Sequence, residues 1–131
     1  MYVSRWIMAY NPYLNFLSQE DKLQNSVMNY FRYNYPSAFV IHVPNEGRRT
    51  TFERFKFKHL GGVSGVPDIL CFTKNRFKCG LAIELKVGYN KPTKNQKDCL
   101  ERLKMNNWEV YWTNNYDDCC NYIKKYFDDG L

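Results

Sequence analysis

The sequence has no hydrophobic run near the roughly 18 residues that a membrane-spanning helix needs, so we expect no membrane partner. Its N-terminal apolar stretch, residues 6–10, is too short for the hydrophobic region of a signal peptide. The chain also lacks the low hydrophobicity of intrinsically disordered proteins. Hydrophobic residues make up 44% of it and aromatic residues 18%, which excludes disorder driven by low hydrophobicity. At 131 residues the chain has room for one domain, which we expect to span residues 1–131.

Cysteine and histidine are too few, or wrongly spaced, for the common structural metal sites. The five cysteines include no CxxC pair, and the adjacent Cys119 and Cys120 suit neither a usual disulfide nor one zinc ion. Only two histidines are present, so one chain cannot supply a three-histidine zinc site. Because no signal peptide is evident, we expect free thiols in a reducing, intracellular compartment.

Several common catalytic signatures are absent as well. The segment 62–66 has serine at its centre, but valine stands where a serine hydrolase motif needs its second glycine. No Gly-Lys-Ser or Gly-Lys-Thr follows the glycines, which excludes a phosphate-binding P-loop. Cys71 and Cys79 lie within or beside apolar strands, where we expect buried and unreactive thiols. Two scattered histidines also fit poorly with HNH nucleases, which use histidine clusters.

Positive charge, in contrast, is abundant and unevenly placed. The chain has 19 Lys and Arg against 13 Asp and Glu, a formal net charge of +6. Five basic and two acidic residues lie between 44 and 62, and nine basic and three acidic residues lie between 74 and 104. The segment between them, 63–73, carries only the carboxylate of Asp68. A polyanion such as a nucleic acid fits this band, although an ordinary solvated basic face would have the same charges.

Hydrophobic periodicity and capping signals predict three helices and four strands. The order helix, strand, strand, strand, helix, strand, helix is typical of an α/β domain around a mixed sheet. The expected helices are 19–34, 92–106 and 117–127, and the expected strands are 38–43, 69–72, 80–86 and 109–113.

A polar and basic stretch from 45 to 65 separates the first two strands. Within it, residues 52–58 alternate phenylalanine with charged side chains, which favours a hairpin strand with one charged face. The phenylalanine rings could stack on nucleic-acid bases, but we expect most of them to fill the core. A connection of this length in a small domain is usually functional or mobile.

Three charged residues indicate a particular chemistry. Glu84 and Lys86 are two apart in an expected strand and therefore project from one face, while Ile83 and Leu85 turn to the core. Pairing with the strand that starts at Asp68 would bring the Asp68 and Glu84 carboxylates together. Two such carboxylates repel unless a cation lies between them, and hard oxygen ligands suit Mg²⁺ or Mn²⁺. Lys86 could then orient or deprotonate an attacking water.

The same residues also permit a purely structural explanation. An isolated Glu-x-Lys is most often an exposed charged strand edge, and Asp68 could simply begin its strand. Here the Glu84–Lys86 segment follows a glycine-rich tract, a Pro-Asp pair and one hairpin, and this combination is much more specific.

The combined pattern resembles the PD-(D/E)xK phosphodiesterase superfamily and, within it, the VRR-NUC family of DNA nucleases. The resemblance covers residues 18–127, which indicates a stand-alone member of the family. It implies a restriction-endonuclease-like three-layer α/β domain with a central mixed β-sheet flanked by helices. The matching positions are Glu20, Gln24, and the segments 44–49 (PNEGRR), 65–68 (GVPD), 84–86 (ELK) and 93–96 (TKNQ).

The resemblance also implies roles for these residues. Asp68 and Glu84 would be the metal carboxylates, with the Leu85 backbone carbonyl and Glu20 as further ligands of Mg²⁺ or Mn²⁺. Lys86 would activate the water that attacks the phosphodiester.

Two further positions of the catalytic set have a structural alternative. Glu20 also suits the dipole of a first helical turn, and Gln96 also completes a capping box with Thr93. For contacts with phosphate groups the resemblance indicates four basic residues: Arg48, Arg49, Lys91 and Lys94.

The resulting hypothesis is a metal-dependent endodeoxyribonuclease that hydrolyses phosphodiester bonds. The resemblance to stand-alone family members implies a homodimer whose partner is branched DNA such as a four-way (Holliday) junction. Two alternatives stay open: a non-catalytic nucleic-acid-binding module of the same fold, and a nuclease that acts on flaps, linear DNA or RNA. A non-catalytic module should have lost Asp68, Glu84 or Lys86, and all three are present.

Overall fold

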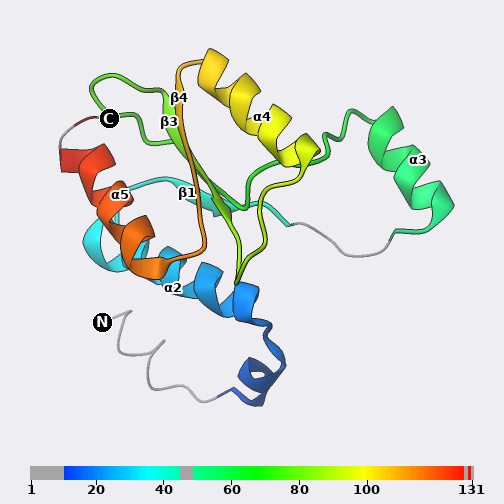
Figure 1. The fold of residues 1–131 in the computed structure, drawn as a ribbon, viewed down its shortest axis with the longest axis horizontal. Coiled ribbons are helices and arrows are strands. Elements are labelled where there is room, and N and C mark those ends of the chain that lie inside the picture. Colours follow the sequence, from blue (N-terminus) through cyan, green and yellow to red (C-terminus); the bar gives the residue numbers. More distant parts are fainter. Residues whose placement is uncertain (1–10, 45–48, 129, 131) are drawn as a thin grey trace.

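The computed structural model describes residues 11–44, 49–128 and 130 of the chain. Its centre is a four-stranded mixed sheet with helices on both faces (Figure 1). In chain order the elements are the 3₁₀-helix η1 (Pro12–Phe16), α2 (Gln19–Asn34), β1 (Val40–His42), α3 (Thr51–His59), β2 (Ile69–Cys71), β3 (Gly80–Leu85), α4 (Lys94–Met105), β4 (Trp108–Thr113) and α5 (Tyr116–Asp128).

The strands lie side by side in the order β1-β2-β3-β4. β1 and β2 are antiparallel, β2 and β3 are antiparallel, and β3 and β4 are parallel. A parallel pair needs a crossover connection, and α4 supplies it. Since Ile69 pairs with Ile83 and Leu85 pairs with Thr113, the start of β2 and the ends of β3 and β4 lie at the same end of the sheet.

Side chains along β3 alternate between two covered faces of the sheet. Leu81, Ile83 and Leu85 join the main buried cluster together with residues of α2 and α5. The opposite face of β3, which carries Ala82 and Glu84, is covered by α4. All six residues of β3 are buried, as expected for a central strand between two helical layers.

Helix α2 places its N-terminus beside the end of the sheet at which β3 ends (Figure 1). Ser18 begins the helix with a capping box: its hydroxyl accepts from the Asp21 N–H, and the Asp21 carboxylate accepts from the Ser18 N–H. Val27 and Phe31, about one turn apart, are 0% and 2% exposed against the sheet. Burial of each such side chain contributes about 1.5–3 kcal/mol. With α2 fixed in this way, Glu20 in its first turn lies within electrostatic range of Lys86, the residue after β3.

Residues 51–59 form the helix α3 and not the hairpin strand that the alternating pattern favoured. Thr50 begins this helix with a second capping box, closed by Glu53. Phe57 is half-buried, but Phe52 and Phe55 are 68% and 61% exposed, so the expectation that most of these rings fill the core is wrong. A capped helix satisfies its backbone groups locally, whereas a strand here would need a partner strand.

The other predicted elements are present, with small shifts at their ends. The expected strand 38–43 is shorter, since β1 covers Val40–His42, and η1 was not predicted. All five cysteines are free thiols as expected, but Cys79 is exposed and not buried. In the described part of the chain, no helix is both long and apolar enough to cross a bilayer.

Candidate active site

The Asp68 and Glu84 side chains meet across the β2–β3 pair. Because Ile69 pairs with Ile83 in an antiparallel ladder, Asp68, one residue before β2, comes opposite Glu84. Asp68 Oδ2 accepts a hydrogen bond of 2.8 Å from the Leu85 backbone N–H. Strand pairing therefore brings the two residues together, and this hydrogen bond holds the Asp68 carboxylate against β3.

The side chain of Glu84 is almost completely buried, with 1% exposed. Among the described residues, neither of its carboxylate oxygens has a hydrogen-bond partner, although Oε2 lies 3.4 Å from Nζ of Lys86 as an ion pair. Burial, and after it the charge of Asp68, raises the pKa of Glu84 to about 8, and Lys86 opposes this shift. A carboxylate held in this way favours additional positive charge beside it.

Lys86 directly follows β3, and both its backbone and its side chain are held in place. Its backbone N–H donates a hydrogen bond of 2.9 Å to the Thr113 carbonyl of β4, and its side chain is only 12% exposed. Glu84 and Lys86 therefore do not form the exposed charged strand edge that an isolated Glu-x-Lys would have suggested.

Glu20 reaches the same region from the first turn of α2. Burial raises the pKa of Glu20, the Asp68 charge raises it further, and Lys86 lowers it, so Glu20 lies within electrostatic range of both residues. Within residues 11–44, 49–128 and 130, no three Asp, Glu, His or Cys side chains are grouped closely enough to hold a metal ion. Glu20 thus stands near the Asp68–Glu84 pair without completing a ligand cluster.

The glycine tract before Asp68 contacts the start of α4. A β-carbon on Gly65 would lie 2.5 Å from the Asn95 carbonyl carbon and 2.7 Å from the Gln96 nitrogen, and Gly65 has a φ of +82°. Only glycine fits both the space and the backbone conformation. Gln96 Oε1 accepts a 2.8 Å hydrogen bond from the Thr93 N–H, so the side-chain amide of Gln96 serves the helix cap. The close approach of the Gly65 backbone to the backbone of Asn95 and Gln96 keeps the first turn of α4 beside the loop that carries Asp68.

His42, at the end of β1, is a neighbour of the site that the sequence analysis did not include. Its Nδ1 lies 3.1 Å from the Asp68 backbone oxygen, and the Val43 N–H donates a 2.8 Å hydrogen bond to the same oxygen. Together they hold the backbone at Asp68. The antiparallel register, which pairs His42 with Ile69, could have located this histidine once β1 was aligned with β2.

The candidate phosphate contacts lie on different elements around the site. Lys94 is exposed in the first turn of α4, and Lys91 is exposed in the connection before it. Arg49 lies at the base of α3 with its guanidinium carbon 3.9 Å from the centre of the Phe57 ring. Arg48 lies outside the described residues.

A groove of about 250 Å³ runs between the base of α3 and the Asp68 loop. Arg49 and Phe57 line one side of it, and Gly65 and Val66 line the other, two to three residues before Asp68. The groove therefore places the Arg49 side chain beside the loop that leads to Asp68.

The oxygen donors at this end of the sheet fit a hard divalent cation. Asp68 and Glu84 supply two carboxylates, and the buried Glu84 oxygens without hydrogen bonds are the observation that favours a cation. Mg²⁺ binds through one or two carboxylates and keeps several waters, so a third protein carboxylate is not required.

Comparison with known proteins adds structural neighbours. No family model matches the sequence, and no curated protein matches it. A solved structure named "VRR_NUC domain protein" is similar with a TM-score of 0.71 and 26% sequence identity, over 88% of this chain and 96% of its own. Another, named "VRR_NUC domain", has a TM-score of 0.58 and 20% identity over 85% of this chain and 100% of its own, and shows the fold alone.

The mixed four-stranded sheet between helical layers, together with these neighbours, defines a restriction-endonuclease-like α/β domain. The likeness to the first of them supports assignment of the chain to the VRR-NUC family. It also supports a nuclease-family function in general terms.

Proposed function

We propose that the protein is a DNA endonuclease that hydrolyses phosphodiester bonds with Mg²⁺ or Mn²⁺ at Asp68, Glu84 and Lys86. The observation that carries this proposal is the buried carboxylate pair, 3% and 1% exposed, with a single lysine 3.4 Å from Glu84. One lysine balances only one of two carboxylates. Ionising both carboxylates is costly in a buried site, which is why the pKa of Glu84 is raised, and a divalent cation would offset that cost.

Each residue has a defined task in this proposal. Asp68 and Glu84, with the Leu85 carbonyl and Glu20 as further candidates, hold the cation, which when bound supplies Lewis acidity toward phosphate and water. Lys86 orients the attacking water and donates a hydrogen bond to the phosphate. The water oxygen would form a bond to phosphorus in line with the leaving sugar oxygen and release a proton to solvent. The P–O bond to that sugar oxygen would break, and the sugar oxygen would take up a proton from solvent.

The surrounding charges support DNA as the substrate. Arg49 lies just before α3, Lys91 and Lys94 lie just before and at the start of α4, and Arg48 precedes Arg49 in the chain. Contacts of this kind position a nucleic acid backbone without reading its sequence. Selectivity for branched DNA, such as four-way junctions, is the finer part of the proposal and rests on the family resemblance.

The proposal is tested with end-labelled four-way junction, splayed-arm and linear duplex DNA, each incubated with Mg²⁺, Mn²⁺ or EDTA. We expect paired, metal-dependent cuts on the junction. Lys86→Ala should abolish cleavage by the loss of water orientation while DNA binding changes little, and Asp68→Asn should remove the stimulation by metal.

Three outcomes would contradict parts of this proposal. Full activity of Lys86→Ala, or wild-type cleavage in excess EDTA, would overturn the mechanism. Cuts on flaps or linear DNA alone would keep the chemistry and remove the junction preference. Binding without cleavage under any metal, by protein shown to be folded, would favour a non-catalytic module.

We further propose that the protein acts as a homodimer, because one chain carries one site and symmetric cuts on two strands need two. Exposed aromatic side chains offer surface for the contact. Phe39, just before β1, and Phe72, just after β2, are 64% and 44% exposed, with ring centroids 5.6 Å apart. Tyr13 and Phe16 of η1 are 73% and 82% exposed.

Light scattering at several protein concentrations measures the oligomeric state. We expect the mass of a dimer, and a monomer mass for Phe39→Asp with Phe72→Asp, because two buried charges would oppose the contact. A monomeric wild type that still cuts junctions symmetrically would contradict the proposal.

A further inference from the structure

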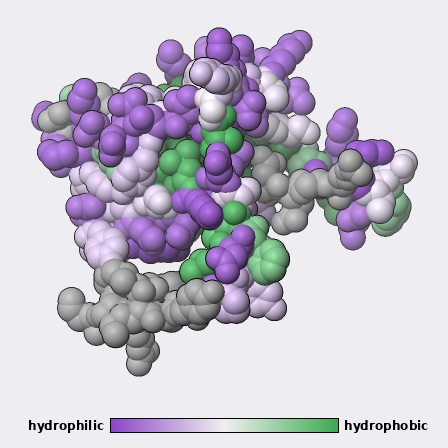
Figure 2. All heavy atoms as spheres, turned by 60° about the horizontal axis from the view of Figure 1, so that its bottom comes forward, coloured by the Kyte–Doolittle hydropathy of each residue, from purple (hydrophilic) through white to green (hydrophobic). Residues whose placement is uncertain are grey.

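Helix α3 stands away from the rest of the molecule. It lies between β1 and β2 in the chain but joins neither helical layer (Figure 1). In the space-filling view its lobe is separate from the body and carries both hydrophobic and hydrophilic surface (Figure 2). A nine-residue helix with no buried residue has little stability of its own. Tertiary packing within the chain therefore does not explain why this helix carries apolar side chains.

The phenylalanines of α3 point in two directions. Phe57 faces inward, since a β-carbon on Gly62 would lie 2.4 Å from the Phe57 ring and Arg49 lies over the same ring. Phe52 and Phe55, three residues apart and thus on one helical face, are 68% and 61% exposed. Phe55 stacks on His59 with ring centroids 5.2 Å apart, which extends the outer aromatic face by one turn.

Positive charge flanks this aromatic face. Arg54, Lys56 and Lys58 are exposed, and the one acidic residue of the helix, Glu53, is engaged in the cap. At 100° per residue, Lys56 lies about 40° from Phe52 on one side of the face, and Lys58 lies about 60° from Phe55 on the other, with Arg54 about 100° from Phe55 on that second side. An aromatic strip between two basic edges complements a nucleic acid, with bases against the rings and phosphates against the charges.

A second copy of the chain fits this face less well. A two-fold contact would place the same basic edges against each other, and like charges across an interface are repulsive. The location also favours DNA, because the groove lined by Arg49, Phe57, Gly65 and Val66 joins the base of α3 to the Asp68 loop. A backbone held on α3 and along this groove would therefore pass the loop that ends at Asp68.

We propose that α3 is a DNA-binding arm whose Phe52 and Phe55 side chains contact unstacked bases at a branch point, while Arg54 and Lys58 contact phosphates. This rests on DNA being the substrate, as proposed above, and adds the element that distinguishes branched from linear DNA. Bases at a junction or flap expose their faces, whereas bases within a linear duplex are stacked and unavailable to the rings.

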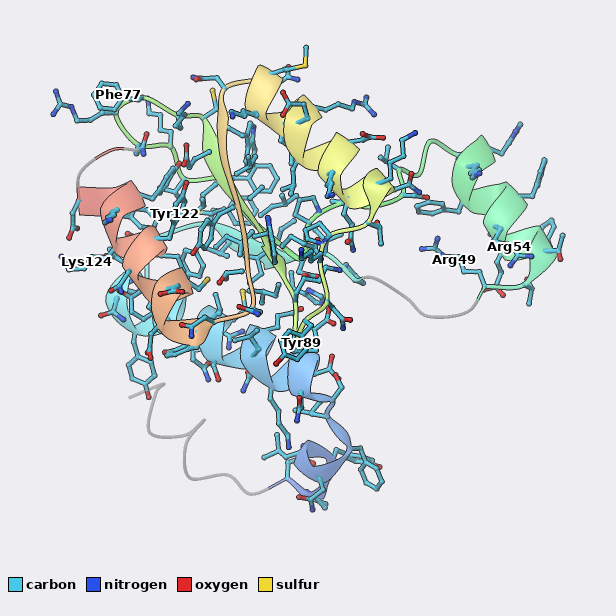
Figure 3. All side chains as sticks on the ribbon, viewed as in Figure 1. Arg49, Arg54, Phe77, Tyr89, Tyr122 and Lys124 are labelled. Carbon is cyan, nitrogen blue, oxygen red and sulfur yellow. The ribbon has the colours of Figure 1, made fainter. Side chains whose placement is uncertain are left out.

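The test compares Phe52→Ala/Phe55→Ala with a matched control, Phe77→Ala, in the full-length protein. Phe77 is an exposed phenylalanine, 56%, beneath an arginine on the opposite side of the molecule (Figure 3). Binding is measured in EDTA, where cleavage is prevented. The two DNAs are a four-way junction with 2-aminopurine at the branch position and a linear duplex with 2-aminopurine at the matching position of the same strand. We expect about tenfold weaker junction binding and a smaller fluorescence change for the double variant, little change on duplex, and no effect of Phe77→Ala.

The charged edge is tested separately with Arg54→Ala/Lys58→Ala and the control Arg76→Ala. Removing two phosphate contacts should weaken binding to both DNA forms and reduce the slope of log K against log salt by about two. Replacing Phe52 and Phe55 with tryptophan keeps the rings and should preserve junction binding. Near-UV circular dichroism confirms that each variant is folded.

The arm and the nuclease can fail independently. Unchanged junction binding and fluorescence in Phe52→Ala/Phe55→Ala, beside metal-dependent cleavage by the wild type, would overturn the arm alone. Loss of junction preference in that variant without cleavage by the wild type would support the arm and overturn the nuclease. A fall from dimer to monomer mass in Phe52→Ala/Phe55→Ala would assign the face to a second copy and overturn the arm.

Discussion

At the residue scale, Glu84 combines a proposed role in the active site with a cost in stability. Its carboxylate is buried beside that of Asp68, and neither Glu84 oxygen has a hydrogen bond among the described residues. Groups of this kind destabilise the charged form of a protein unless a cation offsets them. The stability of the protein should therefore depend on both pH and divalent cations through this one side chain.

The first prediction concerns pH. Because the pKa of Glu84 is raised to about 8 in the folded state, from 4.5, metal-free protein should lose stability as pH rises from about 4.5 to about 8. Below 4.5 the group is protonated in both states and the stability is fully present. Glu84→Gln should remove this loss and stabilise the metal-free protein at pH 8 by on the order of 2–4 kcal/mol, since each pKa unit corresponds to about 1.4 kcal/mol.

Urea unfolding at several pH values, in EDTA and then in Mg²⁺, measures this effect. Mg²⁺ should stabilise the wild type at pH 8 and leave Glu84→Gln nearly unchanged, because the variant lacks a ligand. Glu101→Gln, an exposed carboxylate on α4, is the matched control and should follow the wild type. A Glu84→Gln variant with the same pH dependence as the wild type would contradict the prediction.

The proximity of Asp68, Glu84 and Lys86 could be predicted from the sequence because it follows from two simple rules of strand geometry. Residues two apart in a strand share a face, and an antiparallel hairpin brings the start of one strand to the end of the next. The burial of Glu84 could not be predicted in this way, because it depends on α4 crossing over β3. The backbone contact between Gly65 and Gln96 likewise depends on tertiary structure and could not be predicted from local sequence patterns.

At the element scale, the Asp68 loop is held against α4 by a contact that tolerates no side chain. Gly65→Ala would add a β-carbon 2.5 Å from the Asn95 carbonyl carbon at a φ of +82°. We predict a destabilisation of about 2–4 kcal/mol, which combines the left-handed backbone with overlap against helix backbone. Displacement of the loop should also lower any cleavage activity, because Asp68 moves with it.

The control for this substitution is Gly88→Ala. Gly88 also has a positive φ, +58°, but nothing lies within 4 Å of its added β-carbon. Gly88→Ala should therefore cost only the backbone term, about 1–2 kcal/mol. Equal destabilisation of the two variants in urea unfolding would show that close packing against α4 is not what requires glycine at residue 65.

Helix α3 is the element for which the sequence pattern gave a wrong prediction. The alternation in residues 52–58 has the period of a strand, but Thr50 and Glu53 also have the spacing of a capping box, which signals a helix start. The two signals conflict, and the structure follows the capping box, in which Thr50 and Glu53 satisfy backbone groups at the helix start. The exposure of Phe52 and Phe55 could not be predicted from their hydrophobicity, since it results from the place where α3 leaves the fold.

At the scale of the whole molecule, the basic residues should act as one salt-dependent surface. DNA affinity should fall linearly in log K against log salt, with a slope of about −0.9 for each phosphate contacted. Lys91→Ala and Lys94→Ala should each reduce the magnitude of that slope by about one. Lys124→Ala, on α5 across the molecule and paired with Asp128 at 2.7 Å, should leave it unchanged (Figure 3).

Fluorescence anisotropy with a fixed DNA at several salt concentrations measures these slopes. Parallel lines for the wild type and all three variants would show that Lys91 and Lys94 do not contact phosphate. A change for Lys124→Ala equal to the others would show a diffuse effect of net charge and no localised surface.

The position of α3 in the chain has an evolutionary consequence. The helix is an excursion between β1 and β2, while the carboxylate pair sits on the β2–β3 hairpin, so no strand register depends on how long the excursion is. Mutations that lengthen, shorten or recompose α3 can therefore be accepted without moving Asp68 relative to Glu84. If α3 binds nucleic acid as proposed, selection can change which nucleic acid is held while the proposed hydrolytic centre is inherited intact.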